Sequence, residues 1–194
     1  APMPPQRRHD RFSVKQRALV APGLVNACKA FSGQFATPVA GGPLESWIVE
    51  NVSRGGFGAV LNELPGEWLK VGALLAMQPE GGASWLLAIV RRYHRQGESE
   101  AHIGIETLAL QAEPVDVRTR AASTYAAVAG IPALLLREGG VAGEVRVLLP
   151  FASFDLRETL QYAQGSKRFQ LSPVAIVEQY ADYELARYRL SEIA

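Results

Sequence analysis

Apolar residues along this chain recur in short runs that are separated by turn residues. Between residues 47 and 110, β-rich runs are interrupted about every ten residues by glycine, proline or polar turn signals. One of these runs, His102–Leu108, alternates with a period of two, which is typical of a strand with one buried face. The pattern predicts a small antiparallel β-barrel or sandwich.

The same β texture returns in the last third of the chain, where short apolar runs fill much of residues 133–190. Between the two β-rich halves, residues 114–129 are rich in alanine and lack interior glycine and proline, which predicts the one substantial helix. Residues 25–35 fit a short helix or an edge strand equally well. We therefore expect an all-β chain with a minor helix. Its expected parts are an arginine-bearing arm at 1–12, a barrel at 13–113, and a second antiparallel β domain with a short connecting helix at 114–194.

Composition and charge narrow the function classes. Hydrophobic residues make up 48% of the chain and charged residues 20%, which is ordinary for a globular protein. The formal net charge of +1 argues against a nucleic-acid polymer as the partner, so any anion site has to be built locally. No apolar run approaches the roughly 18–20 residues of a membrane span.

The compartment is predicted from the same sequence. The first residues are proline-rich and then basic, unlike a signal peptide. The lone cysteine, Cys28, can form no intrachain disulfide, which suits a reducing compartment, and we expect it to be a small core residue. We expect a cytoplasmic protein without membrane insertion.

Motifs of enzymes and metal sites are incomplete in this sequence. Gly56-Phe57-Gly58 is followed by Leu61 where a dinucleotide-binding loop needs glycine, and Ser53 lacks the first glycine of a GxSxG elbow. No metal-binding spacing joins Cys28 to the histidines, which are His9, His94 and His102. We expect no enzyme activity, no metal and no cofactor.

Two motifs remain. Arg7, Arg8 and Arg11 lie in a charged cluster, and Arg7 to Arg11 has the spacing RxxxR. Alone, such a cluster fits a solvated tail. Asn51-Val52-Ser53-Arg54-Gly55-Gly56 reads NxSxxG, and alone it fits a plain hairpin turn.

Their order along the chain resembles the PilZ family. Members of that family carry RxxxR, then [DN]xSxxG, then a strand that ends in an apolar–Arg run, and then a closing strand with GxE. Here the last two features are Trp85–Arg92 and Ile103–Glu106. The resemblance covers residues 7–112.

PilZ domains are small antiparallel β-barrels, and many bind cyclic di-GMP, so the resemblance implies a receptor for that ligand. It implies that Arg7, Arg8 and Arg11 clamp the ligand, because an arginine can fork onto guanine O6 and N7 and can stack on a purine. Asn51 and Ser53 would pair with a guanine edge or a phosphate, and Gly56 would allow the backbone to approach closely.

Two features depart from the family pattern. Asparagine at position 51 replaces the commoner aspartate, and 39 residues separate Arg11 from Asn51. Either an insertion lies between Phe12 and Trp47, or the arginines of the arm are not the family motif. In the second case Arg17 is a further candidate.

Other functions stay open. The chain can be a PilZ-like barrel that binds no nucleotide and acts through an unknown protein partner in motility or surface-appendage control. A single-stranded nucleic-acid binder is a weaker alternative, because the grooves that bind single strands are basic and the formal net charge of this chain is only +1. Arg91, Arg92 and Arg95 are expected to project into solvent, where one of them could reach a phosphate. Residues 130–194 show no chemical motif and are interpreted as a partner or scaffold surface.

Overall fold

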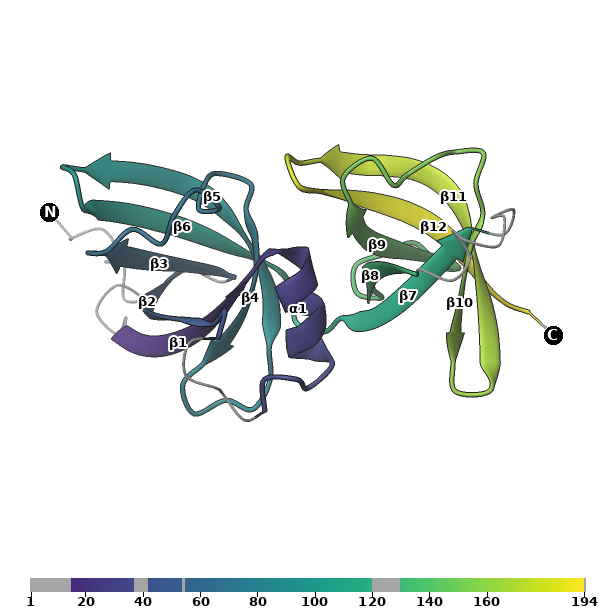
Figure 1. The fold of residues 1–194 in the computed structure, drawn as a ribbon, viewed down its shortest axis with the longest axis horizontal. Helices are drawn as coiled ribbons and strands as arrows, with labels where there is room; N and C mark the ends of the chain where they lie inside the picture. Colours follow the sequence, from purple (N-terminus) through teal and green to yellow (C-terminus); the bar gives the residue numbers. More distant parts are fainter. Residues whose placement is uncertain (1–14, 37–41, 54, 120–129, 194) are drawn as a thin grey trace, which may run out of the picture.

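The computed structural model describes residues 15–36, 42–53, 55–119 and 130–193 and folds them into two closed antiparallel β-barrels (Figure 1). The expected all-β fold with a minor helix is confirmed. The order around the first barrel is β1-β2-β3-β6-β5-β4. Its strands are β1 (Lys15–Pro22), β2 (Glu45–Ser53), β3 (Gly56–Leu61), β4 (Leu74–Pro79), β5 (Leu86–Gln96) and β6 (Glu100–Ala109).

The second barrel repeats this topology. Read around the barrel from β7, its order is β7-β8-β9-β12-β11-β10, which matches the first barrel strand for strand in chain order. Its strands are β7 (Glu113–Thr119), β8 (Ile131–Leu136), β9 (Glu144–Pro150), β10 (Leu160–Gln164), β11 (Lys167–Gln179) and β12 (Tyr183–Ile193). The two halves share one architecture although their sequences show no convincing repeat.

The helix expected at 114–129 is wrong for its first part, because residues 113–119 form strand β7. The segment alternates β-branched Val115 and Val117 with polar Asp116 and Arg118, and Val117 is fully buried. This period of two fits a strand, which pairs with β8 and β10. The rest of the expected helix, residues 120–129, lies outside the described residues.

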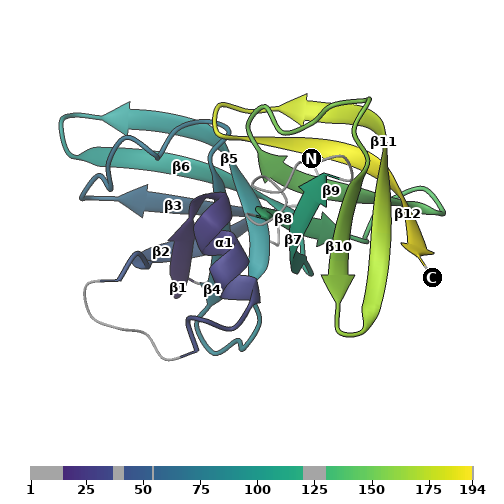
Figure 2. The ribbon, with the colours of Figure 1, turned by 45° about the vertical axis from the view of Figure 1, so that its right-hand side comes forward.

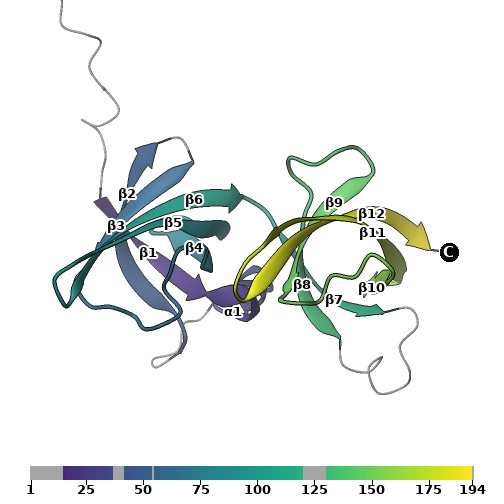
Figure 3. The ribbon, with the colours of Figure 1, turned by 90° about the horizontal axis from the view of Figure 1, so that it is seen from above.

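A helix does form in the segment that the sequence left open. Helix α1 (Gly23–Phe31) buries Leu24, Ala27 and Ala30, which recur on one face of the helix. It packs against β1 and β4 of the first barrel and against β7, β8 and β9 of the second. Figures 1 and 3 show α1 at the junction of the two barrels. The stretch that separates Arg11 from Asn51 thus contains both β1 and α1.

The two barrels share an apolar core at this junction, in addition to the core inside each barrel. The shared cluster joins Leu24 of α1 and Leu87 of β5 to Leu134 and Leu148 of the second barrel, all with little or no exposed surface. Cys28 packs against this cluster, and burial together with nearby Asp116 raises the pKa of its thiol to about 12. The sequence-based expectation of a packed cysteine agrees with this position.

One hairpin of the second barrel reaches the first barrel. The turn between β11 and β12 lies beside β5 and β6, as Figure 2 shows in yellow against teal. In this turn the Tyr183 hydroxyl donates a hydrogen bond to the carbonyl oxygen of Gly72 at 2.7 Å, and Lys70 forms an ion pair with Asp182 at 3.5 Å. The hairpin therefore places side chains of the second barrel close to β5. Among the residues that the structure describes, no helix is both long enough and apolar enough to span a membrane.

Candidate ligand groove

A groove of about 660 Å³ crosses strands β3, β6 and β5 of the first barrel and ends at the β2–β3 turn. This volume lies within the range of small-molecule sites in proteins. The lining residues are Val52, Gly55, Gly56, Phe57, Gly58, Arg91, Arg92, His94, His102, Ile103, Gly104, Ile105 and Glu106. Arginine, histidine and glutamate therefore stand together with glycine-rich backbone at one surface.

Glycines form part of the floor of this groove. Gly58 on β3 pairs with Gly104 on β6, so two residues without side chains lie opposite each other. A Cβ atom at Gly58 would lie 2.9 Å from Cγ2 of Val52, and a Cβ atom at Gly104 would lie 3.1 Å from Cβ of Arg92. Both glycines thus leave space that their neighbours use, and the stem of Arg92 lies over Gly104.

A β-bulge brings two arginines to the groove. Successive side chains on a regular strand point to opposite faces, so Arg91 and Arg92 would normally be separated. The register between β5 and β6 shifts between Val90 and Arg92, and both arginines are exposed and line the groove. Bulges re-aim side chains in this way and are common beside functional sites.

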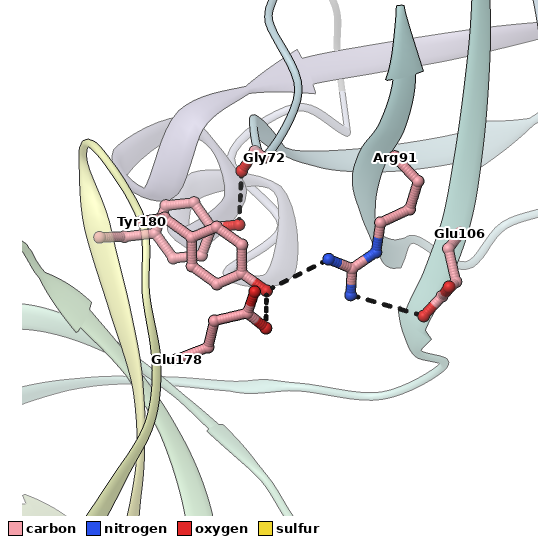
Figure 4. Close-up of polar contacts among 6 residues, drawn as sticks. Gly72, Arg91, Glu106, Glu178 and Tyr180 are labelled. Atoms are coloured by element: carbon pink, nitrogen blue, oxygen red, sulfur yellow. Dashed lines mark hydrogen bonds and ion pairs between the residues drawn. The ribbon is translucent and has the colours of Figure 1, made fainter.

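The two guanidinium groups differ in their contacts. Arg91 donates a hydrogen bond of 3.5 Å to the Tyr180 hydroxyl and pairs with Glu106 at 3.5 Å (Figure 4). Partial burial lowers the pKa of Arg91, but the hydrogen bond to Tyr180 and the nearby Glu106 raise it further, so the net shift is upward. Arg92 makes no hydrogen bond or ion pair with the described residues, so its guanidinium is available to an anion.

The predicted NxSxxG residues lie at the β2–β3 turn, at one end of the groove. Asn51 is exposed and pairs with Phe57, while Ser53 pairs with Gly56. A register shift between Asn51 and Ser53 marks a second bulge at Val52, so simple alternation does not set the direction of the Asn51 side chain. Gly56 lines the groove with Val52, whereas Asn51 lies beside it rather than in its lining.

The positive φ in this turn belongs to Gly55, at +91°. A side chain at this position would be strained, because only glycine adopts such a φ without cost. From the sequence, Gly56 was expected to let the backbone approach a ligand closely, and it is the first residue of β3. The double glycine was the available signal, but it left open which of the two residues has the positive φ.

The arginines of the arm, Arg7, Arg8 and Arg11, lie outside the described residues. The start of β1 is described, and Lys15 pairs with Glu50, the neighbour of Asn51. The chain thus enters the first barrel next to the NxSxxG turn. Arg17 lies further along β1, where it pairs with Ile48 and contacts Ser46, and it is not part of the groove lining.

The tryptophans take part in apolar packing and do not line the groove. Trp47 and Trp68 stack with ring centroids 6.0 Å apart, and both ring N–H groups donate to the carboxylate of Glu45. Trp85 packs against the shared cluster at the barrel junction and forms a tilted pair with Phe35. In the described part of the chain, no group of three or more His, Cys, Asp or Glu side chains could hold a metal ion.

Part of the chain is similar to a known family of domains. Residues 42–114 match the family model described as cyclic-di-GMP receptor FimW, middle PilZ domain. This part of the chain is thus similar to a PilZ domain. The match runs from just before β2 to the start of β7, so every residue that lines the groove falls within it. No curated protein and no solved structure shows a significant match to the chain.

Proposed function

We propose that this protein is a receptor that binds cyclic di-GMP in the groove of its PilZ domain. The observation that carries the proposal is the position of Arg91 and Arg92. A bulge brings both arginines into the lining of a groove that also contains glycine backbone, inside the segment that matches the PilZ domain of a cyclic-di-GMP receptor.

The chemistry of the groove fits this ligand. Cyclic di-GMP has two anionic phosphates and two guanines, and arginine can pair with a phosphate, fork onto guanine O6 and N7, or stack on a purine face. Lysine has neither the planar fork nor the stacking surface. Arg92 has no partner among the described residues, and the Glu106 carboxylate can accept hydrogen bonds from guanine N–H groups. The groove thus offers groups for both parts of the ligand.

The arm and the turn complete the proposed site. Arg11 is four residues before Lys15, so an extended chain would place it at most about 14 Å from the start of β1 beside Asn51. We assign the clamp to Arg7, Arg8 and Arg11. Asn51 and Ser53 would hold a guanine edge or phosphate, with Gly56 at the groove floor.

The receptor would act in the cytoplasm and report the ligand to a protein partner. The second barrel supports this role because its β11–β12 hairpin contacts the first barrel near the groove. A protein partner that binds this hairpin would respond to ligand binding in the groove without contacting the ligand.

Isothermal titration of the full chain tests the proposal. We expect saturable binding of cyclic di-GMP and no comparable heat with GTP or cyclic AMP. The reason is that only cyclic di-GMP offers two guanines joined through two phosphates to a groove with two arginines. Absence of heat with cyclic di-GMP would contradict the proposal and favour a PilZ barrel that works through protein contacts alone.

A further inference from the structure

Arg91 belongs to the groove and to the contact between the barrels at the same time. It lines the groove on β5, and its guanidinium reaches the Tyr180 hydroxyl at the end of β11. These two residues are 89 positions apart in the sequence. One charged side chain therefore connects the proposed ligand surface to the second barrel.

The tip of the hairpin is organised around Tyr180 (Figure 4). Its hydroxyl donates a hydrogen bond of 2.6 Å to the carboxylate of Glu178 and accepts one from Arg91. Burial and the hydrogen bond with Glu178 raise the pKa of Tyr180, so the hydroxyl keeps its proton at neutral pH. The Tyr180 ring stacks on Tyr183, with centroids 4.4 Å apart.

The contacts of Arg91 are weak enough to be exchanged. Both its hydrogen bond to Tyr180 and its ion pair with Glu106 measure 3.5 Å, whereas a charge-assisted pair with a phosphate is normally about 2.7–2.9 Å long. More than a third of the Arg91 side chain is exposed. An anion in the groove would therefore compete effectively for this guanidinium.

We propose that Arg91 couples the groove to the β11–β12 hairpin, because a ligand phosphate takes its guanidinium away from Tyr180 and frees the hairpin tip. This inference rests on the proposed function. The apolar cluster between the barrels stays packed, since it is buried and does not involve Arg91. The hydrogen bond from Tyr183 to Gly72 also stays, so the change is confined to the tip around Glu178 and Tyr180.

Coupling of this kind acts in both directions, because a contact that is lost on binding opposes binding. Tyr180→Phe removes the hydroxyl that holds Arg91 and keeps the ring stacked on Tyr183. We expect this variant to bind cyclic di-GMP about 2- to 10-fold more tightly than the wild type, the range for one hydrogen bond. In an Arg91→Ala background the same substitution should have no effect on affinity.

Tyr183→Phe is the matched control. It removes another hydrogen bond of the same hairpin to the first barrel, and it keeps the hydrogen bond from Arg91 to the Tyr180 hydroxyl. Its affinity should equal that of the wild type, because a hydrogen bond that is kept in both the free and the bound state does not oppose binding. If both variants bind cyclic di-GMP more tightly to the same extent, the route through Arg91 is overturned, because any loosening of the hairpin would then be enough to raise the affinity.

Hydrogen exchange gives the structural readout. With saturating cyclic di-GMP, amides of the peptide that covers residues 177–183 should exchange faster than in the free protein. Suppose that the wild type binds cyclic di-GMP. If Tyr180→Phe then leaves the affinity unchanged, or if exchange at residues 177–183 does not change, the inference is overturned and the proposed function stays intact. A wild type that does not bind cyclic di-GMP overturns both.

Discussion

Arg92→Ala is expected to weaken cyclic di-GMP binding by about 30- to 150-fold, which corresponds to roughly 2–3 kcal/mol. The substitution removes a guanidinium that has no partner among the described residues and whose aliphatic stem lies over Gly104 in the groove. It takes away a charge-assisted contact and a stacking surface together. Isothermal titration against the wild type measures the effect.

Arg95→Ala is the control for charge. Arg95 lies on the same strand, β5, but donates to the carbonyl oxygen of Glu98 and is not part of the groove lining. The control should bind like the wild type, and both variants should keep their stability because exposed side chains contribute little to it. Equal losses of affinity in the two variants would mean that general electrostatic attraction, and not the groove, accounts for binding.

Glu184→Ala is expected to lower the free energy of unfolding by about 3 kcal/mol. Glu184 is only 2% exposed. One of its carboxylate oxygens accepts hydrogen bonds from the backbone N–H groups of Ser153 and Phe154, and the other accepts one from Gln179. Alanine would leave buried donors without an acceptor, next to a turn in which Ala152 has a φ of +65°. Urea denaturation measures the change.

Glu184→Gln separates the hydrogen bonds of this side chain from its charge. The amide oxygen can still accept from the two backbone N–H groups, and the Gln179 amide can turn to accept from the new amide nitrogen. This variant should lose only about 1 kcal/mol, the cost of exchanging a charged acceptor for a neutral one. If alanine costs no more than glutamine, the carboxylate does not hold the turn as its contacts indicate.

The barrels could be predicted from sequence because their signals are local. Alternation of apolar and polar residues, as in His102–Leu108, reports a strand with one buried face wherever that strand is paired. The NxSxxG turn is likewise a continuous stretch between two β-rich runs, so its position between β2 and β3 follows from the sequence. Strand β7 was missed because the alanine-rich residues that follow outweighed the alternating valines at 115 and 117.

The groove itself could not be predicted, because it depends on register and on long-range contacts. A bulge at Arg91 is a property of the pairing between β5 and β6, and the sequence of β5 alone gives no sign of it. Arg91 and Arg92 were expected to project into solvent, and they are indeed exposed, but they line a groove whose floor comes from β3 and β6. The contact with Tyr180 joins residues of different barrels, which no local pattern reports.

The central claim is that cyclic di-GMP binds the groove of the first barrel, and an NMR titration of backbone amides with cyclic di-GMP tests it most directly. Backbone amides of glycines report separately on the groove and on the equivalent turn of the second barrel. The groove glycines are Gly55, Gly56, Gly58 and Gly104. The equivalent β8–β9 turn of the second barrel has Gly139, Gly140 and Gly143. We predict saturable shifts for the groove glycines and none of comparable size for the β8–β9 turn. Shifts confined to the second barrel, or no shifts at all, would contradict the account.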